Sequence, residues 1–225
     1  MLAITESSSF AHSVDSTFLF IVGVSVFFLV LITALMITFV IKYSRKRNPV
    51  ATNIHGNIPL EVAWTVIPTI LVLVMFWYGW TGYKEMSEIP ADAYVIDVQG
   101  QMWQWKFTYP NGVQTDSLFI PVNTPVKVNL KSIDVDHSFY VPAFRVKKDV
   151  IPGKQNTAWF KATDVGVFNL FCAEYCGMKH SYMITKVVVL SVNDFNSLLK
   201  KKETISSDSK SMDSTKTIND STKTK

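Results

Sequence analysis

Two long stretches without a charged residue, 18–41 and 62–83, place the strongest constraint on what this chain can fold into. As a helix, the first would be about 36 Å long, enough to cross a hydrocarbon core of about 30 Å. The second is rich in Trp and Tyr near its far end, which is typical of the aromatic belt at a membrane interface. We therefore expect two transmembrane helices, over 18–43 and 62–83.

The segment between these helices, 44–61, indicates how the chain is oriented. Four Lys and Arg residues lie between 42 and 47, and no acidic residue follows them before Glu61. By the positive-inside rule, this loop stays in the cytoplasm. A multi-pass protein in a bacterial-type inner membrane or its equivalent, with both termini on the outer side and lipid as a partner, is expected. Residues 1–17 hold no Lys or Arg, so we expect this short segment to be retained rather than cleaved as a secretory signal.

The second half of the chain changes to short β-branched or alternating runs separated by Pro, Gly and Asn. These runs are Tyr94–Val98, Trp103–Tyr109, Val126–Leu130, Thr157–Phe160, Val167–Phe171 and Met183–Leu190. The pattern predicts an all-β sandwich or barrel over 90–200. A short closing helix is expected over 192–199. Residues 201–225 contain no aromatic residue and are mostly polar, which predicts a disordered tail.

Four metal-binding side chains lie within twelve residues: Cys172, Cys176, His180 and Met183. The whole chain has only two cysteines and four histidines, so composition alone does not account for this cluster. Thiolate, imidazole and thioether ligands suit copper, with zinc as the main competitor for the first two types. A further strong ligand is needed. We expect it to be His137, because His12 lies near the amino terminus and His55 lies in the basic loop.

The two cysteines leave several kinds of site open. A mononuclear blue-copper centre uses a single thiolate, so Cys176 would be surplus, whereas two thiolates shared by two copper ions would use every ligand. A disulfide between the cysteines and a structural zinc site are the other interpretations. Met183 on its own would be read as a core residue, and only its spacing from His180 favours a ligand.

The stretch from Cys172 to Met183 resembles the copper-binding loop of cytochrome c oxidase subunit II, whose pattern is Cys-Ser-Glu-x-Cys-Gly-x-x-His-Ser-x-Met. Ala173 stands where the family usually has serine. The segments His137–Pro142 and Lys147–Gly153 match two further family patterns, and the resemblance covers roughly residues 14–195. It implies a membrane-anchored α+β protein in which a two-helix transmembrane hairpin precedes an all-β, Greek-key, cupredoxin-like domain.

The resemblance also implies a ligand set. Two copper ions would form a binuclear CuA centre, with both cysteine sulfurs bridging, one histidine on each copper, and a methionine sulfur and a glutamate carbonyl as weak ligands. Carried over to this chain, these residues are Cys172, Cys176, His137, His180, Met183 and Glu174. The side chain of Glu174 would also help to hold a magnesium ion shared with subunit I.

Two further residues gain a role from the resemblance. Trp103, Trp105, Phe107 and Tyr109 alternate with polar residues, which predicts that most of them are core. The family, however, has an exposed tryptophan where electrons enter, and it corresponds to Trp103. Glu61 would stand at the entrance of a proton-uptake path. The residues alone also allow Glu61 simply to stabilise the positive end of its helix.

The implied function is that of the electron-accepting subunit of a proton-translocating respiratory oxidase. Electrons would come from cytochrome c or a similar donor and pass to the haem of subunit I, which reduces oxygen to water. Subunit I and other oxidase subunits are the expected partners, and no nucleic acid partner is expected. The alternatives are a membrane-tethered copper carrier or sensor, and a structural subunit of a quinol-oxidising relative.

The docking mode of the donor stays open at this point. Oxidases of this family often present an acidic face to a basic cytochrome c. Residues 91–200 instead carry eleven Lys and Arg against nine Asp and Glu. Either a local acidic patch of Asp134, Asp136 and Asp164 or a mainly apolar contact around Trp103 would serve.

Overall fold

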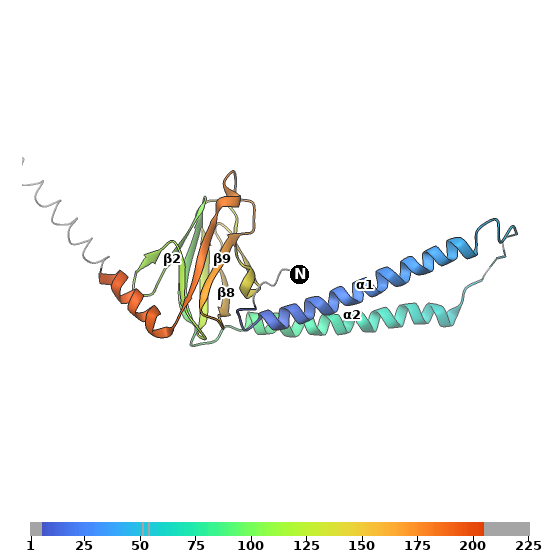
Figure 1. Ribbon diagram of the computed structural model, residues 1–225, viewed down its shortest axis with the longest axis horizontal. Coiled ribbons are helices and arrows are strands. Elements are labelled where there is room, and N and C mark those ends of the chain that lie inside the picture. The colour runs from blue at the N-terminus through green and yellow to red at the C-terminus, as the bar shows by residue number, and fades with distance from the viewer. Residues whose placement is uncertain (1–5, 51, 54, 205–225) are drawn as a thin grey trace, which may run out of the picture. The chain divides into compact units, whose positions relative to one another are not determined.

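The structure is a computed structural model that describes residues 6–50, 52–53 and 55–204 (Figure 1). The chain divides into two compact units. One is the helical unit, His12–Glu85, and the other is the β unit, which combines the N-terminal end up to Ala11 with the chain from Met86 onward.

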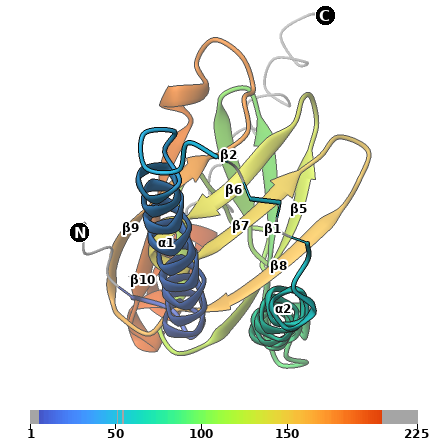
Figure 2. The ribbon, with the colours of Figure 1, turned by 90° about the vertical axis from the view of Figure 1, so that its right-hand side faces the viewer.

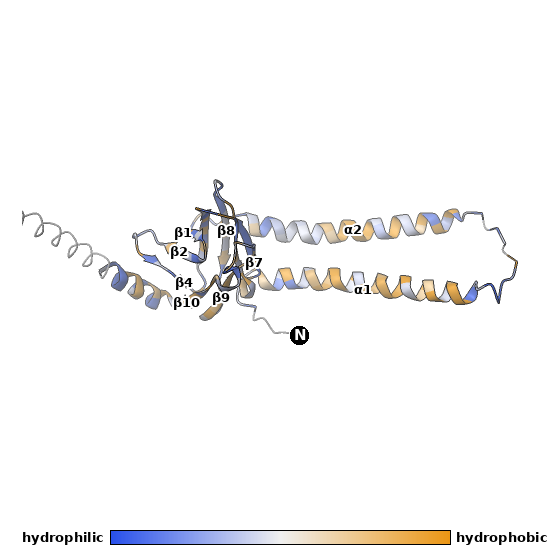
Figure 3. Ribbon diagram, turned by 90° about the horizontal axis from the view of Figure 1, so that it is seen from above, coloured by the Kyte–Doolittle hydropathy of each residue, from blue (hydrophilic) through white to orange (hydrophobic). Residues whose placement is uncertain are grey.

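The helical unit contains two long helices, α1 (Ala11–Lys42) and α2 (Ile58–Ser87). Each contains a stretch long and apolar enough to cross a membrane (Figure 3). No residue of these stretches is buried within the chain. The rings of Phe20 on α1 and Tyr78 on α2 lie 5.6 Å apart, so the helices pack side by side at this point. Both helices run past the ends of their uncharged stretches, because an uncharged run marks the apolar part of a helix and not its caps. At the start of α2, the Asn57 side chain accepts a hydrogen bond from the Leu60 amide (3.2 Å).

The β unit is a sandwich of two five-stranded sheets (Figure 2). The first sheet has the order β3-β2-β1-β5-β8 and the second β4-β10-β9-β6-β7. The strands are β1 (Tyr94–Gln101), β2 (Gln104–Thr108), β3 (Gln114–Thr115), β4 (Leu118–Pro121), β5 (Pro125–Ser132), β6 (His137–Val141), β7 (Val146–Val150), β8 (Asn156–Lys161), β9 (Gly166–Cys172) and β10 (Ile184–Leu190). The predicted fold class, two apolar helices followed by an all-β domain, is confirmed.

Alternation of buried and exposed residues along the strands builds the core between the sheets. On β2, Trp105 and Phe107 are buried while the residues on either side of each are exposed or partly exposed. The rings of Phe139 on β6 and Phe160 on β8 stack across the sandwich with their centroids 6.2 Å apart. These period-two patterns produce a strand with one face in the core, as the sequence predicts.

The N-terminal residues 6–10 are bound to the β unit rather than forming a separate segment. The Ser8 hydroxyl donates to the Phe144 carbonyl (2.8 Å), and the Ser7 amide donates to the Ala143 carbonyl (3.2 Å). Phe10 is fully buried, and its ring meets that of Trp159 edge-on at 4.7 Å. Of the short N-terminal segment predicted over 1–17, residues 7–10 thus contact the sandwich, and α1 begins at Ala11.

A helix over 192–204 closes the β unit. The Asp194 amide donates to the Ser191 hydroxyl (3.2 Å), which caps its start. Phe195 is buried and packs edge-on against Tyr94 at the beginning of β1 (5.4 Å). The helix continues four residues into the segment 201–225 that the sequence predicts to be a tail, and the rest of that segment lies outside the described residues.

Candidate metal centre

The side chains predicted to bind metal come from one end of the second sheet. His137 is the first residue of β6 and Cys172 the last residue of β9. These strands are paired, with Phe139 opposite Cys172. Cys176 lies in the loop that follows β9, and this loop ends in the short 3-10 helix η2 (His180–Tyr182) directly before Met183 and β10. Residues that are distant in sequence therefore meet because two strand ends and one loop converge.

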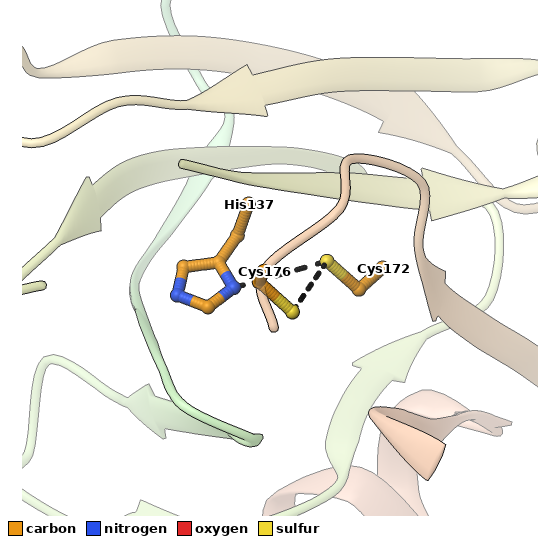
Figure 4. Close-up of side chains that lie close together, drawn as sticks. All are labelled: His137, Cys172 and Cys176. Carbon is orange, nitrogen blue, oxygen red and sulfur yellow. Dashed lines mark hydrogen bonds between the residues drawn. The ribbon is translucent and has the colours of Figure 1, made fainter. Parts of the chain in front are cut away.

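The distances within this cluster are short enough for shared ligation. The Sγ atoms of Cys172 and Cys176 lie 3.8 Å apart, and Cys172 Sγ lies 3.8 Å from Nδ1 of His137 (Figure 4). Cys176 Sγ lies 3.5 Å from Nδ1 of His180 and 3.8 Å from the Met183 sulfur. The ligand atoms of His137, Cys172 and Cys176 all lie within 4.8 Å of one another. Both cysteines are free thiols, so the disulfide interpretation does not apply.

Four of the five side chains in the cluster are shielded from solvent, and His180 is partly exposed. His137 and Met183 are 0% and 1% exposed, and both cysteines are buried. Burial, followed by the neighbouring Cys172 thiol, raises the pKa of Cys176 to about 12. Cys176 is therefore a neutral thiol in the metal-free chain at neutral pH. A metal ion binds the thiolate form, so loading the site must release protons.

The second ring nitrogen of His137 contacts Asp134, which the sequence suggests only as part of an acidic surface patch. His137 Nε2 lies 2.8 Å from a carboxylate oxygen of Asp134. A carboxylate on one imidazole nitrogen orients the ring so that the other nitrogen faces the metal. Burial of Asp134 raises its pKa, but hydrogen bonds from the Met102 amide and from His137 outweigh this, and its pKa lies below the ordinary value. Asp134 is thus an anion directed at the site.

A glycine on the neighbouring sheet makes room for the His137 ring. A Cβ atom on Gly100 would lie 3.1 Å from Cδ2 of His137 and 3.3 Å from the Trp105 ring. Only glycine leaves this space open. No local pattern in the sequence indicates this role of Gly100, because the contact joins β1 to β6 across the sandwich.

Trp103 lies beside the metal loop, although not on the strand predicted for it. The sequence places Trp103 at the start of a strand, but β1 and β2 pair through Gln101 and Gln104, so Met102 and Trp103 form the turn between them. The indole Nε1 donates a hydrogen bond to the Cys176 carbonyl (3.1 Å). The ring is only half-buried and lies against Gly177. The prediction that most of the four alternating aromatic residues are core is confirmed, because Trp105, Phe107 and Tyr109 are buried.

Glu174 has its main chain and its side chain in different environments. Its carbonyl accepts a hydrogen bond from the Cys172 thiol (3.2 Å). Its carboxylate, which is 46% exposed, forms an ion pair with Lys147 Nζ at 2.9 Å, and Lys147 also contacts Asp149 at 2.9 Å. Hydrogen bonds from Lys147 and from the buried Ser138 hydroxyl lower the pKa of Asp149. A small charged network therefore lies next to the cluster.

Glu61, the remaining predicted site residue, belongs to the helical unit. It lies in the first turn of α2 and is exposed. Its carboxylate lies so close to Gly56 that a Cβ atom on that glycine would be 2.7 Å from Oε1. An acidic side chain in the first turn also interacts favourably with the positive end of the helix.

The three residues suggested for a local acidic patch do not all lie together. Asp164 lies between β8 and β9, at the end of β9 opposite to Cys172. The Asp134 carboxylate is 23% exposed and bonds to His137 and to the Met102 and Val135 amides. Asp136 is exposed, so two of the three carboxylates reach the surface near the cluster.

Two buried thiols, two imidazoles and a thioether form a donor set that fits copper. The thioether in contact with Cys176 is unusual for zinc, and rigid burial of soft ligands suits a metal that changes its oxidation state. The donor set is therefore suited to a metal that changes its oxidation state.

Comparison with known proteins agrees with this arrangement. The sequence profile of the cytochrome c oxidase subunit II periplasmic domain matches residues 69–192, and that of the transmembrane domain of the same subunit matches residues 3–79. The chain belongs to the cytochrome c oxidase subunit II family. It is therefore a membrane-anchored subunit of a haem-copper oxidase, an oxidoreductase complex with further subunits, and copper is consistent with this family.

Two relatives align with this chain over most of the length of both sequences. The cytochrome c oxidase subunit 2 of Thermostichus vulcanus is 30% identical, over 89% of this chain and 78% of the relative. That of Cereibacter sphaeroides is 29% identical, over 80% of this chain and 72% of the relative. A crystal structure of the periplasmic domain of subunit II of cytochrome oxidase from Bradyrhizobium japonicum is 30% identical with a TM-score of 0.50, covering 52% of this chain and 98% of that one. The β unit thus resembles the cupredoxin-like domain of subunit II.

Proposed function

We propose that this chain is the electron-accepting subunit of a respiratory terminal oxidase. It takes electrons from cytochrome c at a binuclear CuA centre and passes them to the haem of subunit I, where oxygen is reduced to water. The observation that carries the proposal is the buried cluster in which Cys176 Sγ lies within 3.8 Å of three other ligand atoms, on Cys172, His180 and Met183.

In this proposal, the thiolates of Cys172 and Cys176 and the Nδ1 atoms of His137 and His180 would hold the copper. Met183 and the Glu174 carbonyl would be weaker ligands. Bound copper supplies a one-electron redox couple. The chain holds the ligands in place through strand ends and through Asp134, so little rearrangement accompanies a change of charge.

Trp103 is proposed as the residue through which electrons reach the cluster. Its ring is half-buried at the surface, and its indole N–H bonds directly to the Cys176 carbonyl. A short bonded path therefore leads from the exposed ring to a bridging cysteine.

The surface of the β unit that carries the Glu174 side chain is proposed to face subunit I. The Glu174 carboxylate would be a ligand of a magnesium ion shared with that subunit, since carboxylate oxygens suit this ion. In this chain the carboxylate is held by Lys147. Lys147 contacts Oε1, so Oε2 would be the oxygen offered to the magnesium ion.

We further propose that the β unit and both termini lie on the periplasmic side of a bacterial-type inner membrane. Glu61 would then stand at the cytoplasmic end of α2, at the entrance of a proton-uptake path. The basic loop between the helices supports this orientation. In the reconstituted oxidase, Glu61→Gln should slow turnover while electron transfer into the copper centre keeps its rate. Unchanged turnover would leave Glu61 with only its role at the helix terminus.

The copper content and paramagnetic resonance spectrum of the full chain in detergent test the central proposal. Two copper ions per chain with one unpaired electron shared between both nuclei are expected. One copper with an ordinary mononuclear signal would contradict the bridging role of Cys176. Stable zinc binding without copper uptake would contradict the redox role altogether.

A further inference from the structure

A recess with a polar lining lies between α1 and α2, at the end of the hairpin that joins the β unit. Its volume is about 490 Å³. The residues that line it are His12, Ser13, Ser16, Thr17, Phe20 and Tyr78. These six residues include no Lys, Arg, Asp or Glu. A ligand in this polar recess therefore meets hydroxyl groups and an imidazole rather than a formal charge.

Three hydroxyl groups of the polar recess have no partner. Within the described part of the chain, the side chains of Ser13, Ser16 and Thr17 form no hydrogen bond. Elsewhere on α1, the Ser25 hydroxyl donates to the Ile21 carbonyl one turn earlier (2.8 Å), and two threonines of α2 bond to their own helix in the same way. Such bonds are the usual way for a helix to satisfy a hydroxyl in apolar surroundings. The three groups in the recess thus remain available to a ligand.

An apolar groove adjoins the polar recess. Phe20 lines both of them, and the groove continues between the helices with a volume of about 430 Å³. All of its lining residues are apolar, among them Gly23 and Phe27 on α1 and Ile67 and Leu71 on α2. No atom lies within 4 Å of the position of a Cβ atom on Gly23, so the groove is open at this point.

The length of the groove matches one leaflet of a membrane. From Thr17 to Phe28, a helix rises about 16 Å, and half of a hydrocarbon core of about 30 Å is about 15 Å. The uncharged stretch of α1 begins at residue 18, so the three hydroxyls lie at the boundary where lipid head groups are found. A helix of a partner subunit would instead cross the whole core and would need a groove about twice as long.

We propose that one phospholipid, from the leaflet on the side of the β unit, binds between α1 and α2. Its phosphate oxygens accept hydrogen bonds from Ser13, Ser16 and Thr17, and one acyl chain lies in the apolar groove past Gly23. Because no cation lines the polar recess, the site recognises the phosphate through hydrogen bonds and not through the net charge of the head group. The inference concerns the helical unit alone and is independent of the copper centre.

Three lipids with identical acyl chains test the recognition of the phosphate. Native mass spectrometry of the full chain released from detergent measures the binding of phosphatidylethanolamine, phosphatidylglycerol and diacylglycerol. The two phospholipids should bind one per chain with affinities within about threefold, and diacylglycerol should bind roughly tenfold more weakly. Equal binding of diacylglycerol would overturn the role of the phosphate. A preference above tenfold for the anionic phosphatidylglycerol would overturn recognition without charge.

Variants of the hydroxyl residues locate the head group. Ser13→Ala, Ser16→Ala and Thr17→Val combined should weaken phospholipid binding roughly tenfold and leave diacylglycerol binding unchanged. Ser25→Ala removes a hydroxyl that bonds to its own helix and should have no effect on either lipid. Equal losses in the two proteins would contradict a head-group site in the polar recess.

A phospholipid with a photoreactive diazirine in the middle of one acyl chain locates the chain. In the detergent-solubilised oxidase complex, crosslinks are expected within 19–28 or 67–71. Gly23→Leu should abolish them by filling the apolar groove. Gly79→Leu is the matched control, because its Cβ position is equally open and Gly79 lines neither the recess nor the groove.

Two results of the crosslinking would overturn the inference. Persistence of the crosslinks in Gly23→Leu would show that the acyl chain lies elsewhere. Crosslinks that form in the full chain alone but not in the complex would show that another subunit covers the groove.

Discussion

His137 Nε2 and a carboxylate oxygen of Asp134 lie 2.8 Å apart, on the side of the imidazole that faces away from the two cysteines' sulfurs. This contact fixes the ring so that Nδ1 points toward Cys172. It also places a negative charge behind a histidine proposed to bind copper. The partners are three positions apart, so the short loop that leads into β6 places Asp134 next to the first residue of that strand.

Replacing that carboxylate should weaken the site without removing a ligand. Asp134→Asn keeps an oxygen but loses the charge, and copper affinity should fall roughly 10- to 100-fold, as is common for residues that orient a ligand. Competition with a copper chelator measures this. Asp136→Asn, an exposed neighbour, is the control. Equal affinities for both variants would show that the His137–Asp134 contact has no part in binding.

Gly100→Ala should disturb the His137 ring directly. The added methyl group would lie 3.1 Å from Cδ2 of His137, so the ring or the strand must move, at a cost of about 1–3 kcal/mol. Denaturant unfolding and the copper spectrum should both change. Gly166→Ala, whose methyl group would lie 3.4 Å from the Phe168 ring, should be tolerated much better. An unaltered copper spectrum in Gly100→Ala would count against the tight fit.

Cys176→Ser should lose the electronic coupling between two copper ions while the β unit stays folded. The hydroxyl is close in size to the thiol but does not bridge copper as a thiolate does. Paramagnetic resonance and circular dichroism together measure this outcome. Retention of an unaltered two-copper spectrum would falsify the bridging assignment. Met183→Leu is the companion variant, which should keep both coppers with a shifted spectrum.

The Lys147–Asp149 contact predicts an acid-dependent part of stability. Because the pKa of Asp149 is lowered in the folded chain, its stabilising effect is complete above the ordinary value of 3.8 and is lost as the pH falls through the folded value. Asp149→Asn should destabilise the β unit by about 1 kcal/mol or less near neutral pH, since both partners are nearly half exposed. The two proteins should converge in urea unfolding below that pH. A difference that grows with acidity would contradict this origin.

Phe10→Ala should destabilise the β unit although Phe10 directly precedes α1. Its ring is fully buried against Trp159, and removing such a ring costs about 3–5 kcal/mol. Unfolding of the metal-free chain followed by tryptophan fluorescence measures the loss. Phe18→Ala on α1, which is 62% exposed within the chain, should leave this transition in place. Equal transitions in both variants would mean that residues 6–10 add nothing to the sandwich.

Features of this molecule that depend on neighbouring residues in the chain could be predicted from the sequence. The uncharged runs indicated both helices, and the period of two along Trp105 and Phe107 indicated a strand with one face in the core. The spacing of Cys172, Cys176, His180 and Met183 in a single loop indicates by itself that these side chains share a site.

The residues whose roles could not be predicted from the sequence pattern act through contacts between segments that are far apart in the chain. Gly100 matters because His137 reaches it from the other sheet, and residues 6–10 matter because they bond to the backbone beside η1 (Pro142–Phe144) and β8. Trp103 was assigned to a strand because it continues the alternation of its neighbours. The pairing of Gln101 with Gln104, which no propensity reveals, places it in a turn instead.

Strand pairing and a carboxylate place His137 and Cys172 together at one end of the second sheet. Because a shift of one residue in the pairing of a strand turns its side chains to the other face of the sheet, the register of β6 against β9 also determines whether these two side chains meet. A core substitution that disturbs this register would therefore disrupt the cluster without replacing any of its members.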